Sequence, residues 1–269
     1  MDVSQYLVTP GSELDLSEHD PQAKTGFEGG KRDGKRALPE LNRRLTGLQE
    51  RLWAESRQSL LVVLQAIDTG GKDGTIRHVF RGVNPQGVHV HGFGVPSEWE
   101  TRHDFLWRIH KRTPENGAIT IFNRSHYEDV LVVRVKGLVP EEQWSKRYRH
   151  IREFERMLSD EGTTIVKLFL HISKDEQRQR LQARLDEPDK HWKFSRGDLV
   201  DRELWDVYRE AFEAAISETS TSHAPWYVVP ANRKWYRNLV VSTILIETLE
   251  TMSPTYPEAE TGLDEIVIT

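Results

Sequence analysis

The chain has 269 residues, of which 37% are hydrophobic and 29% charged, and its net charge is −5. This composition is typical of a globular protein, and the length is enough for one large domain or two small ones. The negative net charge argues against a general nucleic-acid binder, the lack of cysteine excludes disulfides, and no apolar run has membrane-spanning length.

The amino-terminal residues 1–36 show little periodicity and predict a wrapped or mobile arm with solvated lysines and arginines. The first 21 residues are polar and acidic and do not form a secretory signal, so we expect a cytoplasmic protein. Leucines spaced three or four residues apart predict a helix over residues 38–56, with Pro39 near its start.

Apolar runs alternate with helical patterns through the rest of the chain. Strands are predicted over residues 60–66, 88–93, 118–122, 164–171 and 226–230. Helices are predicted over residues 76–81, 97–112, 141–158, 203–217 and 235–249, and another is predicted to begin after a Ser173 cap. Ser97 and Glu100 fit a capping box for the second of these helices. This alternation predicts a five-stranded parallel sheet in a three-layer α/β/α sandwich. We assign residues 37–252 to one domain and residues 253–269 to a loosely held tail.

The first predicted strand leads into a glycine-rich loop, Ile67-Asp-Thr-Gly-Gly-Lys-Asp-Gly-Thr75. Backbone N–H groups in such a turn, followed by a helix, form a concave anion site, and Lys72 adds a mobile cation. The loop departs from the phosphate-loop (Walker A) pattern, because Ala66 takes the first glycine position and Asp73 the position of the hydroxyl residue. Asp68 is an unusual anion to find beside a phosphate site, and its presence is explained if it holds a divalent cation or a proton. The alternative is a surface turn in which Asp68 caps the next helix.

Polar residues follow two other predicted strands. Ligands of open parallel sheets bind at the carboxyl ends of the strands, which groups the loop with residues 123–129 and 229–234. Arg124 is predicted to bind phosphate bidentately beside Lys72. The alternative is a structural arginine that pairs with Glu128 or Asp129.

A charged segment over residues 178–200 predicts a lid, since it has few apolar anchors and contains Pro188 and Gly197. Its cations are Arg178, Arg180, Arg184, Lys190, Lys193 and Arg196. The alternative is a solvated helix end. Asp198 is a candidate magnesium ligand together with Asp68, if the fold joins them.

Further basic residues exceed the number that one nucleotide needs. They are Arg77, Arg81, Arg108, Lys111, Arg112, Arg124 and Arg134. In an acidic protein this excess predicts a local basic groove for a long polyanion. Nucleic acid would fit such a groove, but the sequence lacks the interleaved aromatic and basic residues that stack bases. His89 and His91 lack a third ligand at suitable spacing, so a zinc site is not expected.

Four segments together resemble the polyphosphate kinase 2 family. They are residues 67–75, Phe105-Leu-Trp-Arg-Ile-His-Lys111, Asn123-Arg-Ser-His-Tyr-Glu-Asp129 and Lys190-His-Trp-Lys-Phe-Ser-Arg-Gly-Asp198. The resemblance implies a fold similar to thymidylate kinase with a helical lid, and phosphoryl transfer between inorganic polyphosphate and AMP, ADP or ATP. It also implies Mg²⁺, with Mn²⁺ as an alternative, and a homo-oligomer, either dimer or tetramer. Nucleic acid and membranes are not expected as partners.

The resemblance also implies roles for individual residues. Asp68 and Lys72 match the first phosphate motif, Arg124 the second and Arg184 the lid, so these four are the expected catalytic residues. Asp68 and Asp198 are the expected metal ligands. Asn123 stands where aspartate is more usual and Glu128 where asparagine is common, which resembles the subgroup that phosphorylates both AMP and ADP.

Two wider sets of contacts complete the expected site. The expected phosphate-binding residues are Gly70, Gly71, Gly74, Thr75, Arg77, Arg81, Arg134 and Lys193. The expected nucleotide-binding residues are Glu98, Asp104, Arg108, Lys111, Arg112, Asn123 and Glu128.

Two other functions fit parts of the sequence. An ATP-dependent nucleoside or nucleotide kinase of the same fold predicts one compact nucleotide site and little salt dependence. A non-enzymatic polyanion-binding module predicts tolerance to the loss of Asp68, because removing an acid strengthens polyanion binding.

Overall fold

Five parallel strands form one sheet in the order β2-β3-β1-β4-β5. The strands are β1 (Ser59–Gln65), β2 (Val88–Gly92), β3 (Ile119–Asn123), β4 (Thr163–His171) and β5 (Trp226–Pro230). The structure, a computed structural model, describes residues 1–268. All five strands confirm the predicted positions, and all seven residues of β1 are buried, as expected for a strand covered on both faces.

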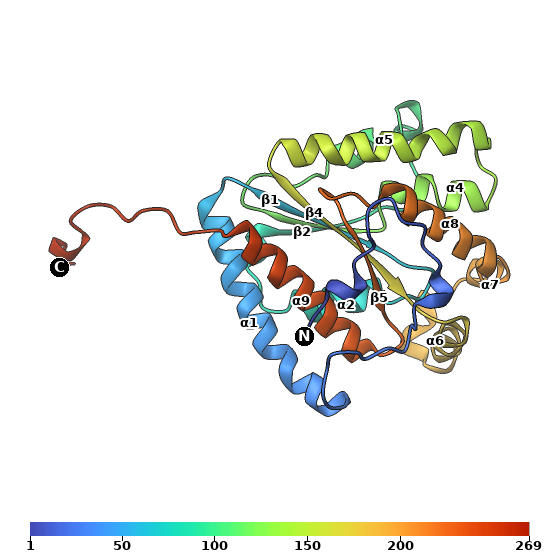
Figure 1. Cartoon of the computed structure of the whole chain (residues 1–269), viewed down its shortest axis with the longest axis horizontal. Helices are drawn as coiled ribbons and strands as arrows, with labels where there is room; N and C mark the ends of the chain where they lie inside the picture. Colours follow the sequence, from blue (N-terminus) through green and yellow to red (C-terminus); the bar gives the residue numbers. More distant parts are fainter. Residues whose placement is uncertain (269) are drawn as a thin grey trace.

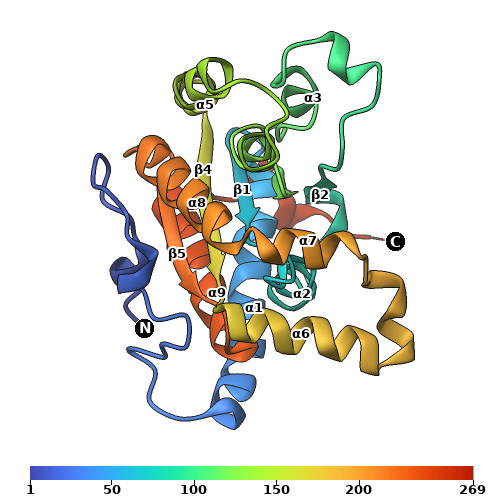
Figure 2. The same ribbon diagram turned by 90° about the vertical axis from the view of Figure 1, so that its right-hand side faces the viewer.

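Helices cover both faces of the sheet, which confirms the predicted three-layer arrangement. They are α1 (Lys31–Glu55), α2 (Lys72–Val79), α3 (Trp107–His110), α4 (Val132–Val135), α5 (Glu141–Asp160), α6 (Lys174–Asp186), α7 (Gly197–Glu203), α8 (Trp205–Thr219) and α9 (Lys234–Met252). Helices α1 and α9 lie together on one face, and α5 and α8 lie on the other (Figures 1 and 2). Helix α6 lies at the carboxyl end of the sheet (Figure 1).

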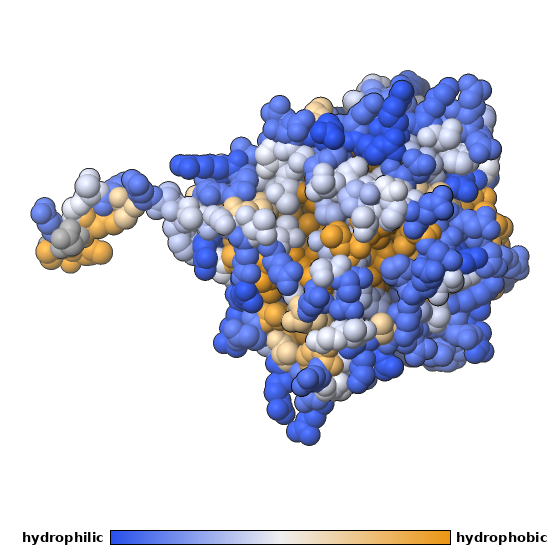
Figure 3. Space-filling view, viewed as in Figure 1, coloured by the Kyte–Doolittle hydropathy of each residue, from blue (hydrophilic) through white to orange (hydrophobic). Residues whose placement is uncertain are grey.

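The amino-terminal segment covers the outer edge of β5. Val8 N–H donates to the carbonyl of Trp226 at 2.8 Å, and Leu7 forms an antiparallel bridge with Tyr227. After the buried Pro254 and the exposed Thr255, whose N–H donates to Glu55 Oε1 at 3.4 Å, residues 256–268 run away from the body of the protein (Figure 1). Hydrophilic residues cover most of the face seen in Figure 3, with a band of apolar residues across its middle. Over residues 1–268, no helix combines the length and the apolar character that a membrane crossing needs.

The boundary predicted between the arm and the first helix is wrong. Helix α1 begins at Lys31 rather than residue 38, so Pro39 lies in the helix interior. Proline removes the N–H that would bond to the carbonyl of Lys35, but both residues are exposed, so this carbonyl is not left buried without a partner. The first two turns of α1 therefore belong to the folded body.

The helix predicted over residues 97–112 is also wrong as a continuous element. It is split into a short 3₁₀ turn (Glu100–Arg102) and the single turn of α3. Asp104 breaks it, because its side chain accepts a hydrogen bond from Leu106 N–H at 3.0 Å and so starts a new turn. The predicted Ser97–Glu100 box does form, with Ser97 N–H donating to Glu100 Oε2 at 2.7 Å and Glu100 N–H to Ser97 Oγ at 3.3 Å.

A buried ion pair joins α5 to β4. Lys167 Nζ lies 2.6 Å from Glu155 Oε2, and both side chains are fully buried. Lys167 also donates to Tyr127 Oη at 2.9 Å and to the carbonyl of Thr219 at 2.7 Å. Although burial alone would raise the pKa of Glu155, Lys167 and His126 lower it. Burial lowers the pKa of Lys167, and the Glu155 carboxylate opposes that effect, so each charge stabilises the other within the apolar layer.

Removing one member of this pair is expected to destabilise the fold. Glu155→Gln leaves the Lys167 ammonium buried without a counter-charge, which should lower the free energy of unfolding by about 3–5 kcal/mol. The double variant Glu155→Leu/Lys167→Met removes both charges and should recover most of that loss. Urea unfolding of the three proteins measures this difference, and equal losses in the single and double variants would contradict it.

Candidate active site

The carboxyl ends of the strands border a cleft of about 1120 Å³. Its charged lining is strongly unbalanced, with eleven cationic residues and three acidic ones. The cations are Lys31, Lys35, Lys72, Arg124, Arg180, Arg184, Lys190, Lys193, Arg233, Lys234 and Arg237, and the acids are Asp68, Asp73 and Glu176. In a protein of net charge −5, this excess marks the cleft as the place for an anion.

The glycine-rich loop forms the floor of the cleft, between β1 and α2. Gly71 has a φ of +96° in the left-handed region, and α2 begins at the next residue. Lys72 is buried, and its Nζ donates to the carbonyl of Ala66 at 3.2 Å. Burial, and secondarily the positive charge of Arg124, lower the pKa of Lys72 to about 8. An anion bound in the loop would restore the full charge of this ammonium.

Arg184 and Arg124 converge on Asp68. Arg184 Nη1 lies 3.0 Å from Asp198 Oδ2 and 3.9 Å from Asp68 Oδ2. Arg124 Nη2 lies 3.4 Å from Asp68 Oδ1, and its Nη1 lies 3.5 Å from Glu128 Oε2. Arg124 adopts a left-handed backbone with φ of 65°, a conformation that is uncommon outside glycine and often marks functional sites. The four expected catalytic residues thus lie in one cleft.

Asp68 and Asp198 lie close to each other beside this cleft, with Arg184 between them. Burial raises the pKa of Asp198, and the Asp68 carboxylate beside it raises that pKa further, against the lowering effects of Ser195 N–H and Arg184. Two carboxylates held this way suit a divalent cation, since Mg²⁺ prefers one or two carboxylates completed by phosphate oxygens and water. Over the described residues, no group of three His, Asp or Glu side chains converges as a metal site.

Some of the expected phosphate-binding residues lie in the cleft, and others do not. Gly70, Gly71, Gly74 and Lys193 line it, and the buried Thr75 donates its hydroxyl to the carbonyl of Gly71 at 3.1 Å. Arg77 and Arg81 are exposed and do not line the cleft, because they lie on or beyond the far end of α2. Arg134 packs 4.7 Å from the ring of Trp144 and donates to Tyr148 Oη at 3.3 Å, again outside the cleft.

The expected nucleotide-binding set is mostly outside the cleft. Only Asn123 lines it, with its Nδ2 donating to Asp73 Oδ1 at 2.8 Å. Arg108 is buried and supports the loop after β2 by donating to the carbonyl of Gly94 at 2.9 Å. Glu128 lies behind Arg124, where burial raises its pKa.

The other members lie on the outer side of the region around α3, because the predicted long helix is broken there. Asp104 and Lys111 line a separate hollow of about 370 Å³, in which Lys111 Nζ lies 3.4 Å above the ring of Trp107. Glu98 is exposed and pairs with Arg102 at 3.3 Å. Arg112 does not line the cleft.

Sequence reasoning missed several cations of the cleft. Lys31 and Lys35, expected to be solvated, line it because α1 starts early and extends beside the loop. Arg237 lies one turn into α9 and was not singled out, although its position after the end of β5 was a usable signal. Its Nη1 donates to the carbonyl of Gly71 at 3.2 Å.

The chain is similar to known proteins over almost its whole length. The model of the family described as polyphosphate kinase 2 matches residues 28–257. An AMP/ADP-polyphosphate phosphotransferase of Meiothermus ruber is 64% identical over 99% of this chain and 100% of its own length. An ADP-polyphosphate phosphotransferase of Rhodopseudomonas palustris is 46% identical over 94% of this chain and 92% of its own length. The crystal structure of polyphosphate kinase 2 from Arthrobacter aurescens matches with a TM-score of 0.93 and 46% identity, covering 97% of this chain and 93% of that one.

The close approach of Arg237 to the loop makes Gly71 sensitive to substitution. A Cβ at Gly71 would overlap Arg237 Nη1, whereas Gly82, with a similar φ of +95°, has only Thr46 Oγ1 nearby at 3.8 Å. Gly82→Ala should therefore lose about 1–2 kcal/mol of unfolding free energy from its backbone conformation alone. Gly71→Ala should lose more unfolding free energy than Gly82→Ala. In the double variant Gly71→Ala/Arg237→Met, the loss should fall toward that of Gly82→Ala, and urea unfolding measures all three. Equal losses in the two single variants would show that Arg237 does not restrict the loop.

Proposed function

This chain belongs to the polyphosphate kinase 2 family, and from that membership we propose that it transfers a phosphoryl group from inorganic polyphosphate to AMP and ADP, reversibly. The AMP/ADP acceptor pair is supported by the printed name of the Meiothermus ruber relative, which is similar over nearly the whole chain. The excess of cations in the cleft is the structural observation that carries the proposal. A polyanionic donor needs such a surface, whereas one nucleotide does not.

Charge on the transferring phosphoryl group is balanced by three cations from different parts of the fold. Lys72 comes from the glycine-rich loop, Arg124 from the end of β3 and Arg184 from α6. Phosphoryl transfer is accelerated mainly by positioning and by charge of this kind, because little covalent chemistry is left to the protein. Asp68 lies within 4 Å of both arginines and would orient them, or the nucleotide phosphate, for in-line transfer.

A divalent ion fits beside these residues. Asp68 and Asp198 would hold Mg²⁺, with Mn²⁺ as an alternative, and the ion would supply charge neutralisation on the phosphate oxygens. Arg184, which lines the cleft, contacts Asp198 at 3.0 Å and would hold this carboxylate in place.

The segment over residues 178–200 supports the role of a lid. It consists of the last turns of α6, a 3₁₀ turn (Pro188–Lys193) and the start of α7. Lys190 and Lys193 line the cleft, and Lys193 Nζ lies 3.8 Å from Asp73 Oδ2 of the loop. Closure over the donor would exclude water, which matters because hydrolysis competes with transfer.

The acceptor is proposed to enter from the side of β2 and β3. Gly92, Phe93, Gly94 and Asn123 line this side of the cleft, where the two glycines leave room for a nucleotide. Arg108 would act indirectly, by holding the carbonyl of Gly94. The homo-oligomeric state and cytoplasmic location expected from the sequence stay predictions.

The proposed reaction is tested by incubating the protein with Mg²⁺, AMP and polyphosphate without ATP. We expect ADP and then ATP to form. Asp68→Asn, Lys72→Ala and Arg184→Ala should each lower kcat by about 100-fold or more, since one charge-stabilising group is typically worth that much.

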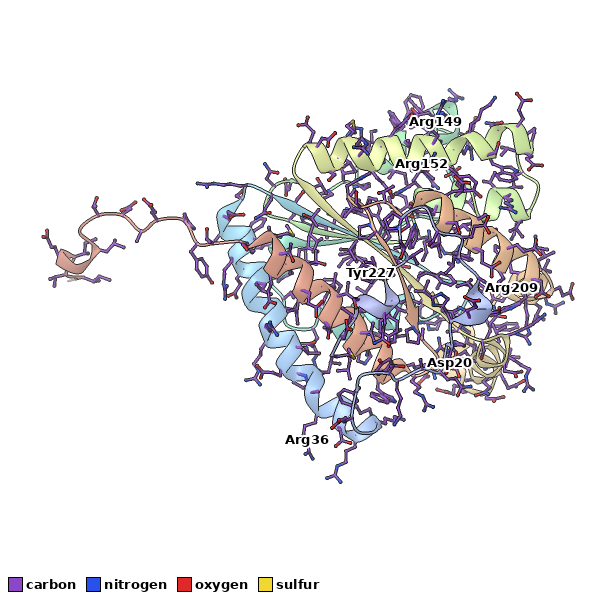
Figure 4. All side chains as sticks on the ribbon, viewed as in Figure 1. Asp20, Arg36, Arg149, Arg152, Arg209 and Tyr227 are labelled. Carbon is purple, nitrogen blue, oxygen red and sulfur yellow. The ribbon has the colours of Figure 1, made fainter. Side chains whose placement is uncertain are left out.

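Arg149→Ala is the matched control, because Arg149 projects from the outer side of α5 (Figure 4) and is exposed. Its kcat should equal that of the unmodified protein. Phosphoryl transfer that requires ATP as donor would instead favour the ATP-dependent kinase. Tight polyphosphate binding without turnover, unaffected by Asp68→Asn, would favour the polyanion-binding module.

A further inference from the structure

Arg237 is a buried arginine directly beneath the glycine-rich loop. Its side chain is 2% exposed, yet it belongs to the lining of the cleft. Its Nη1 donates to the carbonyl of Gly71 at 3.2 Å, and its Nε and Nη2 donate to Asn238 Oδ1 at 3.1 and 2.8 Å. A guanidinium has five N–H donors, so these three bonds leave two N–H groups unused.

No carboxylate balances this guanidinium within residues 1–268. Arg237 forms no salt bridge there, and both of its hydrogen-bond acceptors are neutral amide oxygens. Burial, and then the neighbouring charge of Arg180, lower the pKa of Arg237 to about 9. A pKa this far below that of free arginine reflects a charge that the fold does not compensate.

Arg180 provides the contrast within the same cleft. It is similarly buried and also supports the loop, donating through Nη1 to the carbonyl of Thr69 at 3.0 Å. However, Arg180 Nε lies 2.7 Å from Glu176 Oε1, so its charge is paired. Its Nη2 donates to the carbonyl of Ala231, which ties α6 to the end of β5. These contacts describe a structural residue.

The surroundings of Arg237 add further positive charge. Burial lowers the pKa of Lys234, and the charges of Arg180, Arg237 and Lys190 lower it further against the opposing effect of Glu176. A buried charge without a partner is strongly unfavourable, so a purely structural role would be served better by a neutral side chain. Since Arg237 lines the cleft, its charge is open to an anion bound there.

We propose that Arg237 is a donor-binding residue whose charge is left uncompensated in the ligand-free protein and is neutralised by a phosphate of the bound polyphosphate chain. The inference rests on the proposed function for the identity of the anion, a condensed phosphate. Donor binding then relieves an unfavourable interaction that is present before binding, and this couples polyphosphate affinity to the stability of the fold.

Stability and affinity should therefore respond in opposite directions when this charge is removed. Arg237→Met keeps the approximate length of the side chain without its charge. We expect its melting temperature without ligand to rise by a few degrees. We expect its Kd for polyphosphate to rise by about 10-fold or more, as for loss of a charged contact to the ligand.

The test uses Arg237→Met, Arg237→Lys and the control Arg180→Met in the full chain. Melting temperatures are measured without ligand and with inorganic polyphosphate, and the Kd for polyphosphate is measured by calorimetry without nucleotide. Arg180→Met should lower the ligand-free melting temperature, because it leaves Glu176 unpaired and removes the bonds to Thr69 and Ala231. Arg237→Lys retains the charge and should lie between the native protein and Arg237→Met in affinity.

Two results would overturn the proposal. One is an unchanged Kd for polyphosphate in Arg237→Met. The other is a ligand-free melting temperature of Arg237→Met below that of the native protein, which would assign Arg237 the same structural role as Arg180. If Arg237→Met does not fold, the proposal that the charge of Arg237 is uncompensated in the ligand-free protein is likewise overturned. Arg237→Lys then shows whether the charge contributes to binding. Since the calorimetric Kd requires no turnover, failure of this proposal is distinguishable from failure of the proposed phosphoryl transfer.

Discussion

Buried positive charge at the carboxyl edge of the sheet is the constraint on which the rest of this structure depends. Lys72 and Arg237 are both more than nine-tenths buried, and burial lowers the pKa of each, to about 8 and about 9. A protein that kept these charges for stability alone would pair them with acids, as it pairs Lys167 with Glu155 in the core. At the cleft the pairing is left incomplete, and we propose that a polyanionic substrate completes it.

The topology explains how so many cations meet in one place. A parallel sheet brings the carboxyl ends of all its strands to the same edge, so segments distant in sequence become neighbours. The glycine-rich loop follows β1, Arg124 follows β3, α6 follows β4, and Arg237 follows β5. Each of these four strands leads into one part of the site, while the acids that line the cleft are Asp68, Asp73 and Glu176. Asp68 keeps Arg124 and Arg184 in place without cancelling the positive potential of the whole cleft.

The sequence predicted the elements whose signals are local and strong. Apolar runs predicted the five strands. The departures of the glycine-rich loop from the usual phosphate-loop pattern indicated that Asp68 has a role in the site. Prediction failed where a single side chain redirects the backbone, as Asp104 does when it splits the helix expected over residues 97–112. Prediction also missed Arg237 as a residue of the cleft, because the burial of this side chain depends on packing between α9 and the loop. Such long-range packing leaves no periodic pattern in the sequence, so Arg77, Arg81 and Arg134 were indistinguishable from the cations that do line the cleft.

The most direct test of this account is the number of protons taken up when polyphosphate binds. Burial lowers the pKa of Lys72 to about 8 in the free protein, so its ammonium is only partly charged at pH 8, and a bound phosphate raises that pKa. Terminal phosphates are already ionised at this pH, since their second pKa is about 6. Calorimetry at pH 8 without metal, in buffers of different ionisation enthalpy, should detect net proton uptake on binding. At pH 6 Lys72 is already charged in the free protein, so its contribution to the uptake should disappear. The uptake at pH 8 should also disappear in the Lys72→Arg variant. Binding at pH 8 without proton uptake, or with the same uptake in Lys72→Arg, would contradict the claim that the donor completes an under-compensated cationic site.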